Sequence, residues 1–225
     1  MKAEQGDDDT VRQFAGEFET HLTVRSETCG GGGEPLLLWA ERHGIKYTHI
    51  VLDRGRTPDQ PMLTCRGQGS LAGQLATARQ WSKRLLDDGF RVVRVKIEAA
   101  PWNDEVPKTD AEATDLPEGC YFEHHVKLVL SGELEVAAVR TLAVPHSAHV
   151  SRNARRASAD GRHERFVTQR CRGVGRAEAG RRLDALLRAL AEAGHTAVEV
   201  EEEFVVHDGN FAADAGWIED EPRLV

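Results

Sequence analysis

The stretch Phe18-Glu19-Thr20-His21 returns 104 positions later as Phe122-Glu123-His124-His125, and this recurrence decides the fold. A second motif, Cys65-Arg66-Gly67-Gln68-Gly69, returns as Cys171-Arg172-Gly173-Val174-Gly175 at an offset of 106. An offset that stays near one value along a chain is typical of a duplicated supersecondary unit. The 225 residues therefore predict two modules of about 100 residues each.

Periodicity predicts the same order of elements in both modules. In the first, strands are expected at 17–24, 46–53, 61–66 and 90–98, with helices at 34–44 and 70–88. In the second, strands are expected at 121–130, 146–153, 166–172 and 196–206, with helices at 133–142 and 176–193. This βαββαβ order is that of the ferredoxin-like unit. We therefore expect an α+β fold, a tandem duplication of that unit, with antiparallel sheets that carry their helices on one face.

The remaining segments complete the domain organisation. We expect a flexible tail at 1–13, a first module at 14–102, a linker at 103–119, a second module at 120–207 and an acidic C-terminal extension at 208–225. Hydrophobic residues make up 40% of the chain and charged residues 29%, as in ordinary soluble proteins. No apolar run approaches the roughly 20 residues of a membrane span, and the first ten residues are acidic. These features predict a cytoplasmic protein without a membrane partner.

The net charge of −8 conceals a basic segment. Between Arg152 and Arg188 there are eleven arginines against four acidic residues. The overall charge argues against non-specific binding of nucleic acid, whereas the local cluster permits one contact surface for an anionic partner. An RNA partner is therefore the less favoured alternative.

Polar residues alternate along the expected strands, which assigns them to the face that the helices leave open. Two polar faces on tandem modules are expected to confront each other, or a partner, around a site. The residues concerned include imidazoles and carboxylates in both modules: Glu19, His21, His49, Glu98, Glu123, His125, His149 and Glu203.

Imidazole beside carboxylate suits two kinds of chemistry. His21 and His125, with Glu19 and Glu123, are candidate catalytic residues, because a carboxylate moves the pKa of a neighbouring histidine through the neutral range. Alternatively, Glu19, His21 and Glu98 are candidate ligands of a divalent metal, which is the cofactor that the sequence allows. A solvated, ion-paired sheet face is the third interpretation.

The repeated Cys-Arg-Gly-x-Gly motif is expected between the third strand and the second helix of each module. Glycines there let backbone N–H groups face an anion at the helix N-terminus, and arginine adds a bidentate donor. A tight turn also requires glycine, so a structural role stays open. The candidate ligand-binding residues are Arg66, Gly67, Gly69, Arg172, Gly173, Gly175, His49 and His149.

Two family patterns resemble parts of the chain. His21-Leu22-Thr23 resembles the HxT signature of the 2H phosphoesterases, which also have a duplicated, pseudo-symmetric architecture, although the second copy reads His125-Val126-Lys127. Histidine on the first strand and glutamate on the last resembles the metal-ligand pattern of vicinal oxygen chelate proteins, whose modules are βαβββ. Neither family covers the whole chain.

These observations favour a protein that binds, and as an enzyme would hydrolyse or otherwise process, a small anionic or phosphorylated ligand. The alternative is a non-catalytic module that docks a protein or RNA through the polar sheet face or the Arg152–Arg188 surface. The sequence does not decide between an enzyme and a binding protein. Open edge strands in each module would also allow a homodimer.

Overall fold

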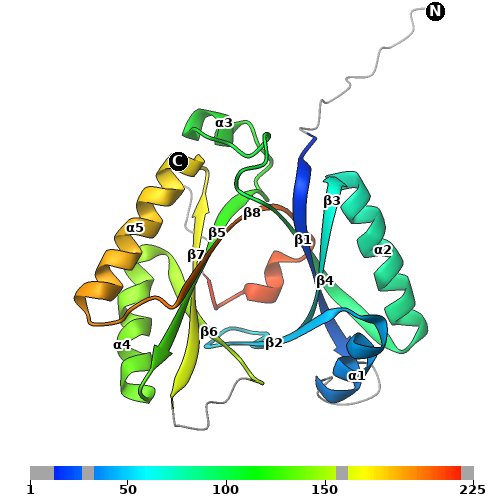
Figure 1. Cartoon of the computed structure of the whole chain (residues 1–225), viewed down its shortest axis with the longest axis horizontal. Coiled ribbons are helices and arrows are strands. Elements are labelled where there is room, and N and C mark those ends of the chain that lie inside the picture. The colour runs from blue at the N-terminus through cyan, green and yellow to red at the C-terminus, as the bar shows by residue number, and fades with distance from the viewer. Residues whose placement is uncertain (1–12, 27–32, 156–161, 219–225) are drawn as a thin grey trace, which may run out of the picture.

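The computed structural model describes residues 13–26, 33–155 and 162–218. Most of the expected tail, the tetraglycine at 30–33 apart from Gly33, and residues 219–225 of the C-terminal extension lie outside the described residues. The elements follow one another along the chain (Figure 1) in this order: β1 (Ala15–Ser26), α1 (Gly33–His43), β2 (Lys46–Leu52), β3 (Asp59–Ser70), α2 (Leu71–Asp87), β4 (Phe90–Ala99), α3 (Asp110–Thr114), β5 (Tyr121–Leu130), α4 (Glu133–Ala143), η1 (Val144–His146), β6 (Ala148–Asn153), β7 (His163–Arg172), α5 (Arg176–Glu192), β8 (Glu199–Asp208) and η2 (Phe211–Asp214).

The eight strands of the described residues form one closed antiparallel barrel in the order β1-β3-β2-β6-β7-β5-β8-β4. The α+β class with antiparallel strands is confirmed. Separate sheets were expected for the two modules, but β2 pairs with β6 and β4 pairs with β8, and these pairings join the two halves. Both edges of each half are thereby paired, so these strands offer no free edge for the dimer that the sequence analysis allowed.

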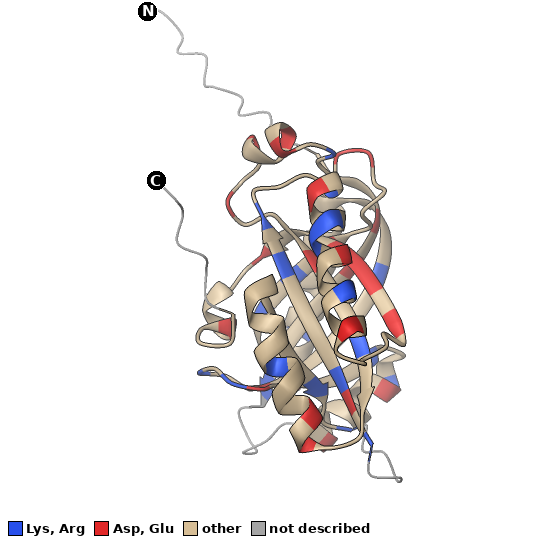
Figure 2. Ribbon diagram, turned by 90° about the vertical axis from the view of Figure 1, so that its left-hand side faces the viewer, with Lys and Arg blue, Asp and Glu red and all other residues tan. Residues whose placement is uncertain are grey.

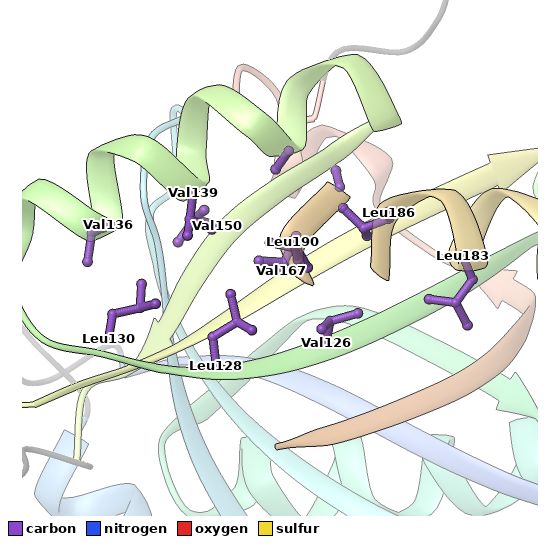
Figure 3. Packing of buried hydrophobic residues seen from close by; sticks show 12 residues of the cluster. Val126, Leu128, Leu130, Val136, Val139, Val150, Val167, Leu183, Leu186 and Leu190 are labelled. Carbon is purple, nitrogen blue, oxygen red and sulfur yellow. The ribbon is translucent and has the colours of Figure 1, made fainter. Parts of the chain in front are cut away.

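The helices lie outside the ring of strands, with α1 and α2 on one side and α4 and α5 on the other (Figure 1). Alternation in the strands sends apolar side chains outward beneath these helices and polar side chains inward. The core under α4 and α5 includes Val126, Leu128 and Leu186, all fully buried (Figure 3). The core under α1 and α2 includes Leu22, Leu36 and Leu85. The polar faces of the strands therefore line the interior of the barrel.

The segment between the two halves contains a residue buried in the core and a capped helix. Val106 is buried in the core beside Phe18 and Phe122. Thr109 caps α3, since its hydroxyl accepts a hydrogen bond from the backbone N–H of Glu112 at 3.3 Å. A stretch expected as a linker thus carries a short helix of its own.

Residues 209–218, here called the C-terminal plug, lie within the outline of the ring of strands (Figure 1). Trp217 is buried and its indole N–H donates to the Val150 carbonyl oxygen at 2.9 Å. The backbone N–H of Arg56 donates to the carbonyl oxygen of Ala215 at 2.9 Å. Two side chains of the expected acidic extension, Asp214 and Trp217, therefore line the interior of the barrel.

Candidate functional site

The barrel lumen holds a cavity of about 270 Å³ that is lined by side chains from all eight strands and from the C-terminal plug. Its lining is unusually rich in charged groups for the interior of a small barrel. The charged and imidazole residues of the lining are Glu19, His21, Lys46, Arg94, Lys96, Glu123, His125, Lys127, Arg170, Glu199, Glu201, Glu203 and Asp214.

In the first half, the site is centred on His21 of β1. Its Nδ1 lies 2.9 Å from the Thr64 hydroxyl and its Nε2 lies 2.6 Å from Glu98 Oε2. Glu19, on the same face of β1, has Oε2 4.0 Å from His21 Nε2 and Oε1 2.5 Å from Arg66 Nε. The imidazole is thus held by a hydroxyl on one nitrogen and faces carboxylates with the other.

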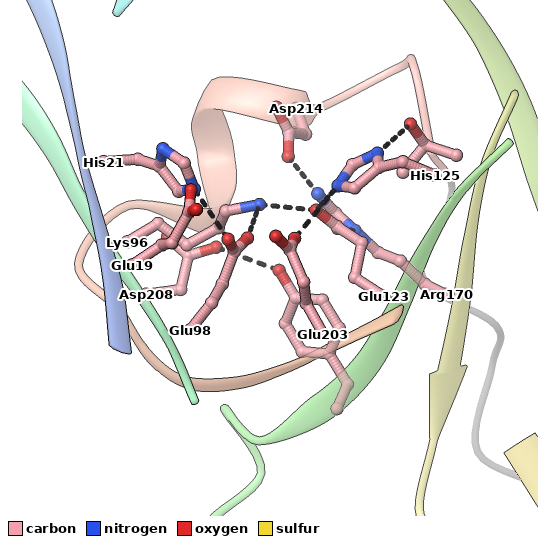
Figure 4. Close-up of polar contacts among 12 residues, drawn as sticks. Glu19, His21, Lys96, Glu98, Glu123, His125, Arg170, Glu203, Asp208 and Asp214 are labelled. Carbon is pink, nitrogen blue, oxygen red and sulfur yellow. Dashed lines mark hydrogen bonds and ion pairs between the residues drawn. The ribbon is translucent and has the colours of Figure 1, made fainter. Parts of the chain in front are cut away.

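The second half repeats this arrangement around His125 of β5. Its Nδ1 lies 3.0 Å from the Thr168 hydroxyl. Its Nε2 lies 3.3 Å from Glu123 Oε1 and 3.4 Å from Glu203 Oε2 (Figure 4). Glu123 Oε2 in turn accepts a hydrogen bond from Arg170 Nε at 2.5 Å.

Strand register makes the two sets equivalent position by position. His21 is paired with Thr64 and Glu19 with Arg66 across β1 and β3, just as His125 is paired with Thr168 and Glu123 with Arg170 across β5 and β7. Glu98 and Glu203 lie opposite Glu19 and Glu123 on the next strands. The spatial counterpart of Arg66 is therefore Arg170, two residues before the Arg172 that the sequence motif indicates.

Lys96 joins the two sets at the centre of the lumen. Its ammonium lies 2.5 Å from Glu98 Oε1 and also contacts Glu123 Oε1 (Figure 4). Burial disfavours its charged form, but Glu123 and Glu98 outweigh burial and hold the pKa of Lys96 well above its usual range. It therefore acts as a fixed positive charge.

The same interactions separate the carboxyl groups into two kinds. Burial would raise the pKa of Glu98 and Glu123, but adjacent cations and imidazoles hold the pKa of both well below the usual range. Burial and the charge of Glu98 raise the pKa of Glu203 to about 7. Burial lowers the pKa of His125, yet hydrogen bonds with Glu123 and Glu203 raise it to about 10.

The C-terminal plug contributes Asp214, which is only 3% exposed. Its Oδ1 accepts hydrogen bonds from Arg94 Nη1 at 3.0 Å and Gln60 Nε2 at 3.1 Å, and its Oδ2 accepts one from Arg170 Nη2 at 2.6 Å. Arg94 also binds Asp208 through Nε at 2.9 Å. Nothing in the periodicity of the sequence indicated that Asp214 reaches the lumen.

Two groups of lumen residues place three metal-ligand atoms within 4.8 Å of one another. One is Glu19, His21 and Glu203, and the other is Glu98, Glu123 and His125. Carboxylate oxygen with one imidazole nitrogen is a donor set that divalent first-row metals accept. In the group that contains Glu19 and His21, the third ligand comes from the other half of the chain, and Glu98 belongs to the other group.

Some expected site residues lie apart from this set. The lumen-facing residues of β2 are Lys46, Thr48, Ile50 and Leu52, so His49 faces the other way, and its Nε2 lies 2.6 Å from Asp59 Oδ1. The side expected for His49 is thus corrected. The central residues of β2 are all partly buried, so the two faces of this strand do not differ clearly in exposure, and the expected alternation of polar and apolar faces does not hold here.

His149 lies beside the C-terminal plug. Its ring centroid is 6.2 Å from that of Trp217, and its Nδ1 lies 3.2 Å from Arg54 Nη2. Burial, together with the nearby charges of Arg54 and Arg170, lowers the pKa of His149 to about 4. At neutral pH it is an uncharged ring next to the plug.

The expected glycine loop is corrected in the first half. β3 continues through Ser70, so Gly67 is paired with Phe18 and Gly69 with Gly16 instead of turning toward a ligand. The strand was expected to end at Arg66, because glycine is uncommon inside strands.

In the second half, Gly173 does turn, with φ of +63°, and Gly175 precedes α5. The N–H of Gly175 already donates to Asp110 Oδ1 at 2.8 Å. Arg172 stacks over the Tyr121 ring at 4.3 Å from its centroid. A carboxylate of the chain itself thus occupies the expected anion position.

An outer cleft meets the lumen at Glu19, Glu98 and Glu203. Glu19 and Glu203 line both spaces, and the cleft is also lined by Arg66 and Trp102. The side chain of Arg66 is 78% exposed, and Trp102 is 63% exposed. The Glu19–Glu203 pair therefore lies between the lumen and solvent.

The arginines between 152 and 188 do not form one surface in the described residues. Arg170 lies inside the lumen, Arg165 pairs with Glu133 at 3.2 Å, and Arg182 pairs with Glu178 at 2.9 Å. Figure 2, which faces the side of α4 and α5, shows acidic segments interspersed among the basic ones. Among the described helices, none has the length and apolar character needed to cross a bilayer.

No family model and no curated protein matches the chain. Solved structures that resemble it include the acetolactate synthase small subunit from Thermotoga maritima, with 11% identity, a TM-score of 0.31, and coverage of 85% of this chain and 96% of that one. A putative chlorite dismutase, TA0507, has 10% identity, a TM-score of 0.28, and coverage of 89% and 97%. A dye-decolorizing protein from V. cholerae has 10% identity, a TM-score of 0.26, and coverage of 86% and 94%. At these values the likenesses carry no argument about ligand or reaction.

Proposed function

We propose that the lumen binds a small anionic or phosphorylated ligand and processes it by acid–base chemistry, in a protein of the cytoplasm. The observation that carries this proposal is the pair of matching Glu–His–Thr–Arg–Glu sets that face one cavity. A cavity of about 270 Å³ suits a compact ligand, since drug-sized ligands occupy about 300–1,000 Å³.

The proposed acid–base groups are His21 and His125, with Glu19 and Glu123. Each imidazole is anchored at Nδ1 by a threonine hydroxyl, which leaves Nε2 directed toward carboxylates. This orientation is what proton transfer to a bound ligand requires.

Two cations near the outer parts of the site are the proposed anion contacts. Lys46 lines the lumen and makes no ion pair within the described part of the chain. Arg66 is exposed at the cleft and pairs with Glu19. The fixed arginines Arg94 and Arg170 already hold carboxylates of the chain, so we assign them to the structure of the lumen.

The finer description of the fold belongs to this proposal as well. We infer that the halves are tandem copies of a ferredoxin-like unit. The support is the shared element order and the five positions where both halves carry the same residue type.

Docking of a protein or RNA is the weaker candidate. Closure of the barrel turns the polar faces inward, where a macromolecule cannot reach them. The arginines of 152–188 are divided between lumen and surface pairs. A homodimer stays a prediction, and it would have to form through a surface other than the paired strand edges.

The test is a binding screen with inorganic phosphate, pyrophosphate, phosphorylated sugars and nucleotides, followed by calorimetry. We expect His21→Gln and His125→Gln to weaken binding of any hit at least tenfold. The matched control is His49→Gln, which lies outside the lumen and should leave binding unchanged. Binding that survives both lumen variants, or a screen without hits, would overturn the proposal.

A further inference from the structure

The two candidate metal groups in the lumen are alike in composition but differ in their existing charges. Each has two carboxylates and one imidazole, with ligand atoms within 4.8 Å of one another. The Lys96 ammonium lies within the group of Glu98, Glu123 and His125 and contacts both of its carboxylates. The group of Glu19, His21 and Glu203 has no such internal cation among the described residues.

We propose that one divalent cation binds between Glu19, His21 and Glu203, and that the Lys96 ammonium takes the place of a second cation beside Glu98 and Glu123. A cation at the first position would neutralise two carboxylates that come from different halves of the chain. The second position already holds Lys96, and Arg170 also binds Glu123. A second divalent ion there would meet positive charge at short range.

The ring of His21 is prepared for such a role. Its Nδ1 is held by the Thr64 hydroxyl at 2.9 Å, which fixes the ring plane and directs Nε2 into the lumen, where a cation would replace the present contact with Glu98 Oε2 at 2.6 Å. A hydrogen bond on the second nitrogen is the usual support for a metal-ligating histidine. Glu19 is similarly held, because Arg66 binds Oε1 and leaves Oε2 on the side of His21.

The position of the group explains how an ion would reach it. Glu19 and Glu203 line both the lumen and the outer cleft, with side-chain exposures of 21% and 18%. Glu98 also borders the outer cleft, but Glu98 and Glu123 are each only 1% exposed. An ion from solvent therefore meets the first group before the second.

Mixed oxygen and nitrogen ligands favour Mn²⁺ or Zn²⁺ over Mg²⁺ and Ca²⁺, which prefer oxygen alone. The site also deepens the proposed function, since a cation beside the cavity would draw an anionic ligand into an acid-rich lumen. This role of the cation rests on the proposed function, but cation binding itself is measured without any ligand. Failure of the two proposals is therefore distinguishable.

The experiment uses the full chain after chelator treatment, titrated with MnCl₂ and with ZnCl₂ by calorimetry and examined by native mass spectrometry. We expect one ion per chain, and at least tenfold weaker binding in Glu19→Gln and in Glu203→Gln. The control, Glu199→Gln, removes a lumen carboxylate outside both groups and should leave affinity unchanged.

Lys96→Met is the decisive variant, because removal of the ammonium should raise the stoichiometry from one ion to two. If this variant does not fold by circular dichroism, Lys96→Gln replaces it with a neutral polar side chain. Two ions in the wild-type protein, one ion in both folded Lys96 variants, or binding indifferent to Glu19→Gln would each overturn the proposal.

Discussion

Replacing Asp214 by asparagine removes a buried negative charge that joins Arg94 to Arg170 through the C-terminal plug. The Asp214 carboxylate accepts hydrogen bonds from both arginines at 3.0 and 2.6 Å and is 3% exposed. Breaking one partner of a buried ion pair costs about 3–5 kcal/mol, because it leaves an uncompensated charge. Arg94 keeps Asp208 and Arg170 keeps Glu123, so we expect the lower end, about 3 kcal/mol.

In a protein of this size, about 3 kcal/mol corresponds to a fall in Tm of roughly 6–12 °C. The free energy of unfolding would be measured by urea titration at pH 7, followed by circular dichroism and tryptophan fluorescence. Burial raises the pKa of Asp214, but Arg170 and Arg94 outweigh it and hold that pKa below its usual range. A lowered carboxyl pKa contributes stability above the unfolded value of about 3.9 and loses it as pH falls, so the difference between wild type and variant should shrink below pH 4.

The matched control is Asp53→Asn, which removes an ion pair with Arg140 on the outside of the barrel. The Arg140 side chain is 43% exposed, so this pair should contribute less than about 1 kcal/mol. If Asp214→Asn loses no more stability than Asp53→Asn, the plug carboxylate does not hold the lumen together as argued.

Three further perturbations test other parts of the fold. Leu186→Ala, at a fully buried position under α5, should cost about 2–5 kcal/mol in urea titration, and a loss below 1 kcal/mol would mean that this core is loosely packed. Gly175→Ala should lower the free energy of unfolding by about 1–3 kcal/mol, because its Cβ would meet the backbone of Thr109 at 2.3 Å. Gly180→Ala, in open space on α5, should instead raise it by up to about 1 kcal/mol, and equal effects of the two substitutions would contradict this prediction. The pKa of His149 is lowered to about 4, so the folded state favours its neutral form. The free energy of unfolding should therefore be highest above the unfolded pKa of about 6.5 and should fall by about 1–2 kcal/mol, a value discounted for partial exposure, as the pH drops to 4. His149→Gln should flatten this part of the stability profile, and an unchanged profile would count against it.

The local pattern of polar and apolar residues was sufficient to predict most strands and helices of the chain. β5 was expected at 121–130 and has those bounds, since the apolar residues Phe122, Val126, Leu128 and Leu130 recur at even spacing along one face. The alternation also placed Glu19, His21, Glu123 and His125 on the polar face, because a strand's side chains must alternate whatever it pairs with. The relation between the halves, by contrast, depends on which strand edges meet, and no periodicity encodes that pairing.

The limits of the sequence motifs have physical causes too. The repeated Cys-Arg-Gly motif suggested that Arg66 and Arg172 are equivalent, but register is set by hydrogen-bonded pairing, which matches Arg66 with Arg170. The position of Lys96 in the lumen was not predicted, and its role depends on the second half of the chain, which supplies Glu123. Asp214 ends the short helix η2, in a segment whose sequence has no periodic pattern from which its position could be predicted.

Closure of the barrel is what turns a repeated sequence into an unequal pair of sites. A polar face in water tolerates any charge, but a closed lumen must neutralise its buried carboxylates. In the second half, Glu123 is fully buried and is matched by Lys96 and Arg170, whereas in the first half Glu19 meets solvent and its partner Arg66 is exposed. Equivalent residues therefore diverge: Glu123 is surrounded by cations of the chain, whereas Glu19 stays accessible to solvent.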